Sequence, residues 1–189
     1  DFSISYVDGR STLPVPKYTF TPQMGGVDCL CEWVYPTRRI LGFDLAGSYG
    51  DLGFWGEMAV FFPEEVKATS DLTPLIGQKL EITTLEKKAY QKYLIGLDYA
   101  IGSFYANLQY LYGFPQEMGA DNLGSYFISC LEWTLGDGKV KIPFNTCLEV
   151  RDFNNFGDNH ALIYQPQLCL YPEMNTEIIL GVRVIDGQP

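Results

Sequence analysis

The stretch KVKIPFNTCLEVR, residues 139–151, alternates between two kinds of side chain almost without error. One set is Val140, Ile142, Phe144, Thr146, Leu148 and Val150, and the other is Lys139, Lys141, Pro143, Asn145, Cys147, Glu149 and Arg151. A period of two predicts a strand whose side chains point alternately to opposite faces of a sheet. In a soluble protein the apolar face packs a core. In a membrane-spanning barrel it meets lipid, and the polar face lines an aqueous interior. The rest of the chain must decide between these structures.

Composition favours a surface that does not all face water. The 189 residues are 47% hydrophobic, 15% aromatic and 19% charged. Soluble domains usually carry about 25% charged residues. No run approaches the ~18 uncharged apolar residues of a spanning helix. If this chain crosses a membrane, we therefore expect it to cross with strands.

Charge and cysteine content exclude several partners and cofactors. The net charge of −10 offers no basic patch for nucleic acid and disfavours docking on anionic lipid. The five cysteines form no CxxC pair, and His160 is the only histidine. We therefore predict no disulfide framework, no metal site and no cofactor.

Four hairpins are predicted along the chain. Their tight turns fall at residues 50–53, 102–103, 136–138 and 172–176, and longer loops at 63–92, 114–122 and 152–159 separate them. Glycine at such turns supplies the positive φ that short hairpin loops need. Short turns at one end, longer loops at the other and strands of roughly 9–13 residues are typical of an outer-membrane barrel.

Two features fit this fold less well. Residues 1–38 contain strand-like stretches around an irregular, proline-containing segment, so we treat them as an irregular part of the barrel preceding the hairpins of 39–189. Pro143 and Pro166 fall inside predicted strands. A closed barrel has no free edge to accommodate them, so each is expected to require a bulge.

The two faces of the predicted strands differ sharply in chemistry. We predict that the polar faces line an enclosed interior through Asp44, Glu57, Asp98, Asn107, Gln109, Glu132, Asn145, Glu149, Arg151, Gln165, Gln167 and Arg183. The apolar faces are nearly free of charge. Aromatic residues gather near strand ends, at Tyr49, Phe54, Tyr93, Phe104, Tyr112, Trp133 and Tyr171. Such rings favour the headgroup boundary, so the pattern predicts an all-β, antiparallel up-and-down transmembrane β-barrel with about eight or more strands in this chain.

Two segments carry a resemblance to a known class. RRILGFDLAGSYGDLGFWGEMAVFFPEE (38–65) and YLIGLDYAIGSFYANLQYLYGF (93–114) resemble strands of porin-like outer-membrane proteins of Gram-negative bacteria. The likeness covers roughly residues 39–186 and includes a G-x-D strand, a glycine turn and a WxExAxFxP strand. It implies a bacterial outer-membrane location and the lipid bilayer as a partner. Such proteins are generally longer and commonly end in a strand with a terminal aromatic, so we expect part of a larger barrel.

The resemblance implies passive diffusion of ions or small solutes. Among the charged candidates, five carboxylates (Asp44, Glu57, Asp98, Glu132 and Glu149) outnumber Arg151 and Arg183. Like charges in a pore lower the entry barrier for cations. Lys139 and Lys141, near one rim, weaken that bias. The segment 63–92 is a candidate gate that folds into the interior, or else an exposed surface loop.

Two alternatives remain open, and a third, an enzyme, is disfavoured. A structural barrel that anchors or sheathes a partner protein would show the same alternation, and a homo-oligomer is compatible with it. A soluble β-sandwich or lipocalin-like module would turn the apolar faces inward to bind a ligand. An enzyme would need His160 beside Asp158 as acid or base, but no G-x-S-x-G nucleophile motif is present, so we predict no enzyme.

Overall fold

The computed structural model describes residues 1–23, 25–72 and 78–187. The prediction of an all-β chain built from antiparallel sheets is confirmed. The strands are β1 (Phe2–Arg10), β2 (Val15–Gln23), β3 (Gly26–Val34), β4 (Thr37–Tyr49), β5 (Leu52–Pro63), β6 (Val66–Asp71), β7 (Lys79–Leu85), β8 (Tyr90–Ile101), β9 (Phe104–Tyr112), β10 (Ser125–Leu135), β11 (Val140–Val150), β12 (His160–Leu170), β13 (Ile178–Gly181) and β14 (Val184–Gly187). A 3-10 turn, η1, spans Phe153–Asn155.

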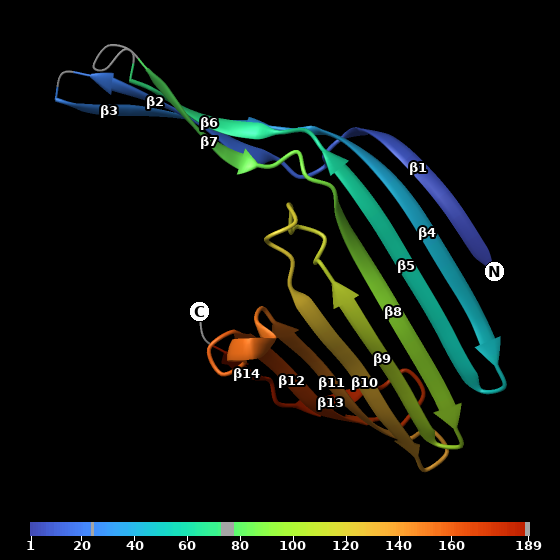
Figure 1. Cartoon of the computed structure of the whole chain (residues 1–189). Coiled ribbons are helices and arrows are strands. Elements are labelled where there is room, and N and C mark those ends of the chain that lie inside the picture. Colours follow the sequence, from blue (N-terminus) through green and yellow to red (C-terminus); the bar gives the residue numbers. More distant parts are fainter. Residues whose placement is uncertain (24, 73–77, 188–189) are drawn as a thin grey trace.

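Ten strands form one large curved sheet (Figure 1). Its order is β1-β4-β5-β8-β9-β10-β11-β12-β13, with β14 also paired to β12, and all these pairs are antiparallel. The hairpin turns β4–β5, β8–β9 and β10–β11 lie together at one end, called the turn end here. Gly50 and Gly102 adopt positive φ at two of these turns, as the sequence predicts. The opposite end, with the longer connections, is the loop end.

The large sheet is open. Among the described residues, β1 pairs only with β4, and β13 and β14 pair only with β12. The two edges do not meet, so the described strands form a curved, open sheet and not a closed barrel.

A second, four-stranded sheet extends from the loop end as an arm (Figure 1). The arm has the order β3-β2-β6-β7, and its β2–β6 pair is parallel. The arm is thus built from two segments that connect strands of the large sheet and that pair with each other. The segment from β1 to β4 supplies β2 and β3, and the segment from β5 to β8 supplies β6 and β7. The structure therefore places the two strands of the candidate gate, 63–92, in the arm, while residues 73–77 of that segment lie outside the described residues.

The first 38 residues contribute one strand to the large sheet and two to the arm. β1 pairs with β4 from Phe2 opposite Leu45 to Arg10 opposite Thr37. The proline-containing part becomes β2, which pairs with β3 over its full length despite Pro16 and Pro22. The segment that looks irregular in sequence is therefore mostly strand.

The expectation of a bulge at each in-strand proline is wrong. Lys141 pairs with Cys169 and Phe144 pairs with Pro166, so the register between β11 and β12 is the same on both sides of Pro143. β13 and β14 also keep one register against β12 and are interrupted opposite Pro166. A proline withdraws one backbone donor but inserts no residue, so the ladder loses bonds here without shifting.

Neither face of the large sheet is covered by the other sheet. The two sheets diverge from the arm's root, and substantial contacts between strands run within each sheet. A buried hydrophobic cluster of Val15, Val66 and Leu85 lies at the root of the arm. The two-layer packing of a soluble sandwich is therefore not what the described residues form.

Candidate functional site: the polar face and the loop above it

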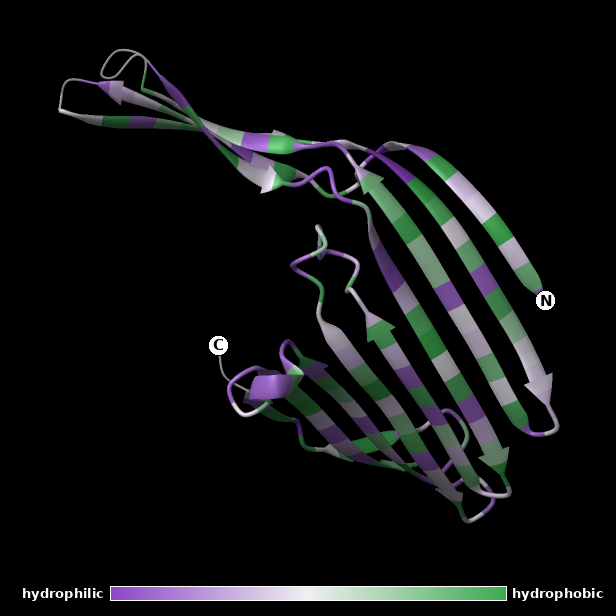
Figure 2. Cartoon of the chain, viewed as in Figure 1, coloured by the Kyte–Doolittle hydropathy of each residue, from purple (hydrophilic) through white to green (hydrophobic). Residues whose placement is uncertain are grey.

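The structure brings all twelve predicted interior residues onto one face of the large sheet. Paired residues in antiparallel strands share a face, so the register fixes this grouping. One line across the sheet runs from Asp98 through Asn107, Cys130 and Asn145 to Gln165. Figure 2 shows the alternation of hydrophilic and hydrophobic residues along the strands that produces this face. We call it the polar face.

Two pairs of side chains that each include an amide are hydrogen-bonded on the polar face. The amide of Gln109 donates to Asn107 at 2.8 Å. Gln165 accepts two hydrogen bonds from the Arg183 guanidinium, at 3.0 and 3.2 Å. Arg183 lies in the break between β13 and β14, and this contact orients it to the polar face. Four of the predicted residues thus form two pairs, one along β9 and one between β12 and the break that separates β13 from β14.

The charges of the polar face are only partly paired. Lys141 lies 3.4 Å from Glu132, and Arg151 forms an ion pair with Glu149. Asp44 accepts a hydrogen bond from Ser3. Within the described part of the chain, no ion pair reaches Glu57 or Asp98. The unpaired Glu57 and Asp98 thus lie on the adjacent strands β5 and β8. Over the whole face, the five predicted carboxylates are matched in number by five cations: Arg38, Lys92, Lys141, Arg151 and Arg183.

The loop 113–124, between β9 and β10, folds over the loop end of the polar face. Its Glu117 carboxylate accepts from the backbone N–H groups of Phe114 (2.7 Å) and Gly124 (3.0 Å) and from the Tyr126 hydroxyl (2.6 Å). The Arg151 guanidinium lies 3.0 Å from the same carboxylate, whose side chain is only 8% exposed. Burial acts to raise the pKa of Glu117, but these hydrogen bonds and Arg151 lower it below the usual value.

Lys92 of β8 holds the loop from below. Its ammonium donates to the backbone carbonyls of Phe114 (2.6 Å), Pro115 (3.2 Å) and Glu117 (2.5 Å). It also lies 5.5 Å from the centre of the Phe61 ring. Charge-assisted bonds are stronger than neutral ones, so a single lysine fixes three backbone carbonyl groups at the start of the loop.

The same loop contacts the arm. Met118 packs against the buried cluster of Val15, Val66 and Leu85 at the arm's root. Lys88, which precedes β8, lies 3.5 Å from Asp121 of the loop. The loop therefore connects the polar face of the large sheet to the arm.

Sequence reasoning missed the residues that hold this loop. Lys92 belongs to the alternating pattern of β8, because it lies two residues before Leu94 on the polar face, and that signal could have found it. Glu117 sits in a loop without periodicity, and its partners are backbone groups and residues of other strands. No local pattern identifies it.

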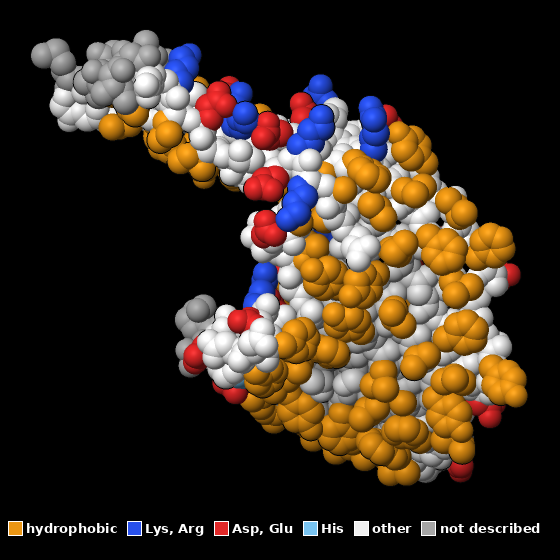
Figure 3. Space-filling view, in the orientation of Figure 1, with side chains coloured by type: hydrophobic (Ala, Val, Ile, Leu, Met, Phe, Trp, Pro, Cys, Tyr) orange, Lys and Arg blue, Asp and Glu red, His pale blue; other side chains and the backbone are white. Residues whose placement is uncertain are grey.

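The opposite face of the large sheet is apolar and exposed. Ile95 and Ile101 are 54% and 56% exposed. Figure 3 shows this face, on which hydrophobic side chains cover the strands and charged ones gather at the arm and the loop end. Aromatic rings meet toward the loop end, at Tyr93, Tyr110, Tyr112 and Phe127, and toward the turn end, at Phe104, Trp133 and Phe144.

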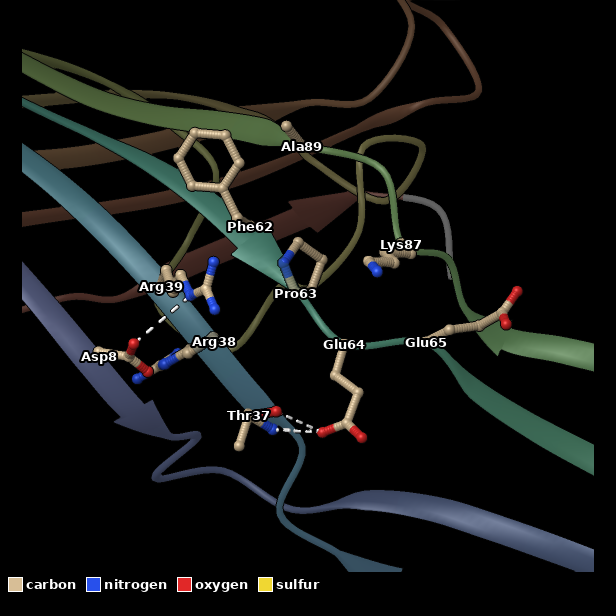
Figure 4. A pocket seen from close by; sticks show the side chains of 10 residues that line it. All are labelled: Asp8, Thr37, Arg38, Arg39, Phe62, Pro63, Glu64, Glu65, Lys87 and Ala89. Atoms are coloured by element: carbon tan, nitrogen blue, oxygen red, sulfur yellow. Dashed lines mark hydrogen bonds and ion pairs between the residues drawn. The ribbon is translucent and has the colours of Figure 1, made fainter.

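A shallow hollow of about 750 Å³ lies at the loop end beside the arm (Figure 4). Arg39 points to Asp8 at 3.4 Å. The carboxylate of Glu64 accepts from the hydroxyl and the backbone N–H of Thr37, which lowers the pKa of Glu64. Asp8, Glu64 and Glu65 balance Arg38, Arg39 and Lys87 in its lining, so the hollow has no net charge to select an ion.

The described part of the chain contains no cluster of metal-ligating side chains and no disulfide. No group of three or more histidine, cysteine or acidic residues there is placed to hold a metal ion. All five cysteines are free thiols.

No helix among the described residues is long and apolar enough to cross a membrane.

Comparison of the chain with protein-family models, with curated proteins and with solved structures finds no match.

Proposed function

We propose that this chain forms part of the wall of a porin-like β-barrel in the bacterial outer membrane, which conducts ions or small solutes by passive diffusion. The observation that carries the proposal is the division of the large sheet into an exposed apolar face and a polar face. A soluble protein rarely leaves a contiguous apolar patch of more than a few hundred Å² in water. Here the apolar face extends across all the long strands.

The dimensions of the apolar face support a bilayer as its surroundings. The stretch of β8 from Tyr93 in the loop-end aromatic group to Ile101 beside the turn-end group is nine residues long. Membrane-spanning strands, which are tilted by about 45°, cross the apolar band of an outer-membrane barrel with about 9–11 residues. The charged arm root and loops lie beyond the loop-end group, where water and headgroups would solvate them.

The open edges at β1 and at β13–β14 expose unpaired backbone groups, which a bilayer cannot solvate. The proposed barrel therefore needs further strands at both edges. A longer chain or further copies of this one would supply them.

The unpaired carboxylates of β5 and β8 support a local preference for cations on this part of the polar face. Glu57 and Asp98 are without an ion pair in the described residues, whereas Glu132 and Glu149 are paired. Loop 113–124 is the element best positioned to narrow the passage, because Lys92 and Glu117 hold it over the polar face.

Conductance across a planar bilayer tests the proposal. We expect the reconstituted protein to pass current and to prefer cations in a salt gradient. Glu57→Gln should lower that preference, whereas Met58→Leu, its neighbour on the apolar face, should leave it unchanged. A protein that inserts but passes no current would support the scaffold alternative, and a preference unaffected by Glu57→Gln would contradict the assignment of the polar face.

A further inference from the structure

The arm has two chemically distinct faces. Alternation and register place twelve residues on one of them, called the arm's apolar face: Pro16, Tyr18, Phe20, Pro22, Val27, Cys29, Cys31, Trp33, Ala68, Ser70, Leu80 and Ile82. None of them is charged. The rings of Tyr18 and Phe20, two residues apart on β2, stack at a centroid distance of 6.1 Å.

The other face of the arm carries its charges. Lys67 of β6 lies 3.0 Å from Glu81 of β7 and 3.4 Å from Glu65. Asp28 of β3 accepts a hydrogen bond from Gln23 of β2. Exposed ion pairs of this kind are normally hydrated, so we expect water to solvate this face of the arm.

The arm's apolar face is uncovered. Trp33 is 65% exposed, Val27 62% and Ile82 61%. Apart from the hydroxyls of Tyr18 and Ser70 and the indole N–H of Trp33, its side chains offer no strong hydrogen-bonding group. A protein interface carries about one hydrogen bond per 100–200 Å² and a polar rim, so this surface is a poor match for a folded partner.

The placement of the arm indicates what covers this face. The arm leaves the loop end and runs across, rather than along, the direction of the large-sheet strands (Figure 1). In Figure 3 hydrophobic side chains follow the side of the arm turned toward the turn end, and charged side chains follow the opposite side. The apolar side of the arm therefore faces the level occupied by the apolar band of the large sheet.

We propose that the arm lies on the bilayer surface as an amphipathic sheet, with its apolar face in the boundary between headgroups and acyl chains. This inference rests on the proposed membrane-spanning sheet, whose apolar band sets the level of the bilayer. Amphipathic elements bind there by burying apolar area about 5–10 Å into the boundary. Tyr and Trp prefer this zone because their rings are apolar and their polar atoms stay near water.

The chain's three tryptophans allow a direct test. Trp33 lies on the arm's apolar face, Trp133 on the apolar face of the large sheet, and Trp55 on the polar face. Two variants keep one indole each, Trp33 (with Trp55→Phe and Trp133→Phe) or Trp133 (with Trp33→Phe and Trp55→Phe). Each is reconstituted into phosphatidylcholine vesicles with bromine atoms near the headgroup end or the methyl end of the acyl chains.

We expect Trp33 to lose more emission with bromines near the headgroups than with bromines near the methyl ends. Trp133 should also be quenched, because it lies in the apolar band. If Trp133 is quenched and Trp33 is not, the arm does not rest on lipid and the inference is wrong, while the spanning sheet stands. If neither is quenched, the proposed function fails and the inference fails with it.

Two single-cysteine variants of the arm allow a second measurement, in which all three tryptophans are kept. Cys29 lies on the apolar face of the arm, and Thr21→Cys would lie on its charged face, one strand away. In vesicles, a water-soluble maleimide should react with Thr21→Cys but slowly with Cys29, the other cysteines being replaced. Equal rates would overturn the inference. Protection of Cys29 without quenching of Trp33 would mean that a protein surface, such as a second copy, covers the face instead.

Discussion

At the scale of single residues, the absence of a side chain at Gly96 makes room for an indole. Gly96 of β8 pairs with Trp55 of β5, and a Cβ at this glycine would overlap the indole ring. We expect Gly96→Ala to destabilise the protein by about 1–3 kcal/mol, the usual effect of overpacking. Equilibrium unfolding by urea in detergent measures this change.

Gly56 provides the matched control. It lies on the neighbouring strand β5, and the nearest atom to a Cβ there is the Leu94 carbonyl oxygen at 3.7 Å. Gly56→Ala should therefore change the free energy of unfolding by no more than about 0.5 kcal/mol. Equal effects of the two substitutions would show that Trp55 does not occupy the space above Gly96.

Glu117 gives loop 113–124 a dependence on pH. Because its pKa is lowered in the folded protein, its ionised form stabilises the loop above the pKa of an unfolded glutamate, about 4.3. That stabilisation is lost as the pH falls through the lower, folded pKa. A spin label at Gln116→Cys, with the native cysteines replaced, should become mobile upon acidification below that range.

Glu117→Gln separates this mechanism from general acid unfolding. The amide keeps the shape of the carboxylate but loses its charge, at a cost of about 1.5–3 kcal/mol for a hydrogen bond to a charged group. The label should then be mobile already at neutral pH, and acid should change it little. A wild-type loop whose label mobility is the same at neutral and acid pH would contradict the role of Glu117.

At the scale of strands, the alternation of polar and apolar residues predicts the hairpins, because each strand of the large sheet has one polar face and one apolar face. It places Asp44, Glu57 and Asn107 on the polar face without any knowledge of register. The arm escapes such prediction, because the parallel pair β2–β6 joins segments distant in sequence. The bulges expected at Pro143 and Pro166 are not found. A proline removes a backbone donor, but the sequence does not show whether the strand register then shifts or only loses hydrogen bonds.

The residues of the candidate site also fall into those that the sequence predicts and those that it does not. Residues inside strands are predictable from a period of two, and Arg183 at the break between β13 and β14 still follows it through its bonds to Gln165. Glu117 acquires its role only when the loop returns to Tyr126 and Arg151. Tertiary contacts of this kind leave no local signal in the sequence.

At the scale of the whole molecule, two amphipathic sheets share one root. The large sheet presents an exposed apolar face, and the arm presents an apolar side at the loop end of that sheet. Loop 113–124 touches both through Lys92 and Met118. In the proposed barrel, lipid on the apolar faces and water on the polar face would satisfy both sheets at once, which neither a sandwich core nor a fully hydrated surface would do.

Single-cysteine labelling along β11 tests most directly which face of the large sheet meets lipid. Thiols at Ile142→Cys, Phe144→Cys and Leu148→Cys would lie on the apolar face, and those at Asn145→Cys, Glu149→Cys and the native Cys147 on the polar face. In reconstituted vesicles, we predict that a water-soluble reagent labels only the second set and a membrane-embedded reagent only the first. Equal labelling of the two sets, or the reverse pattern, would contradict the assignment of lipid to the apolar face.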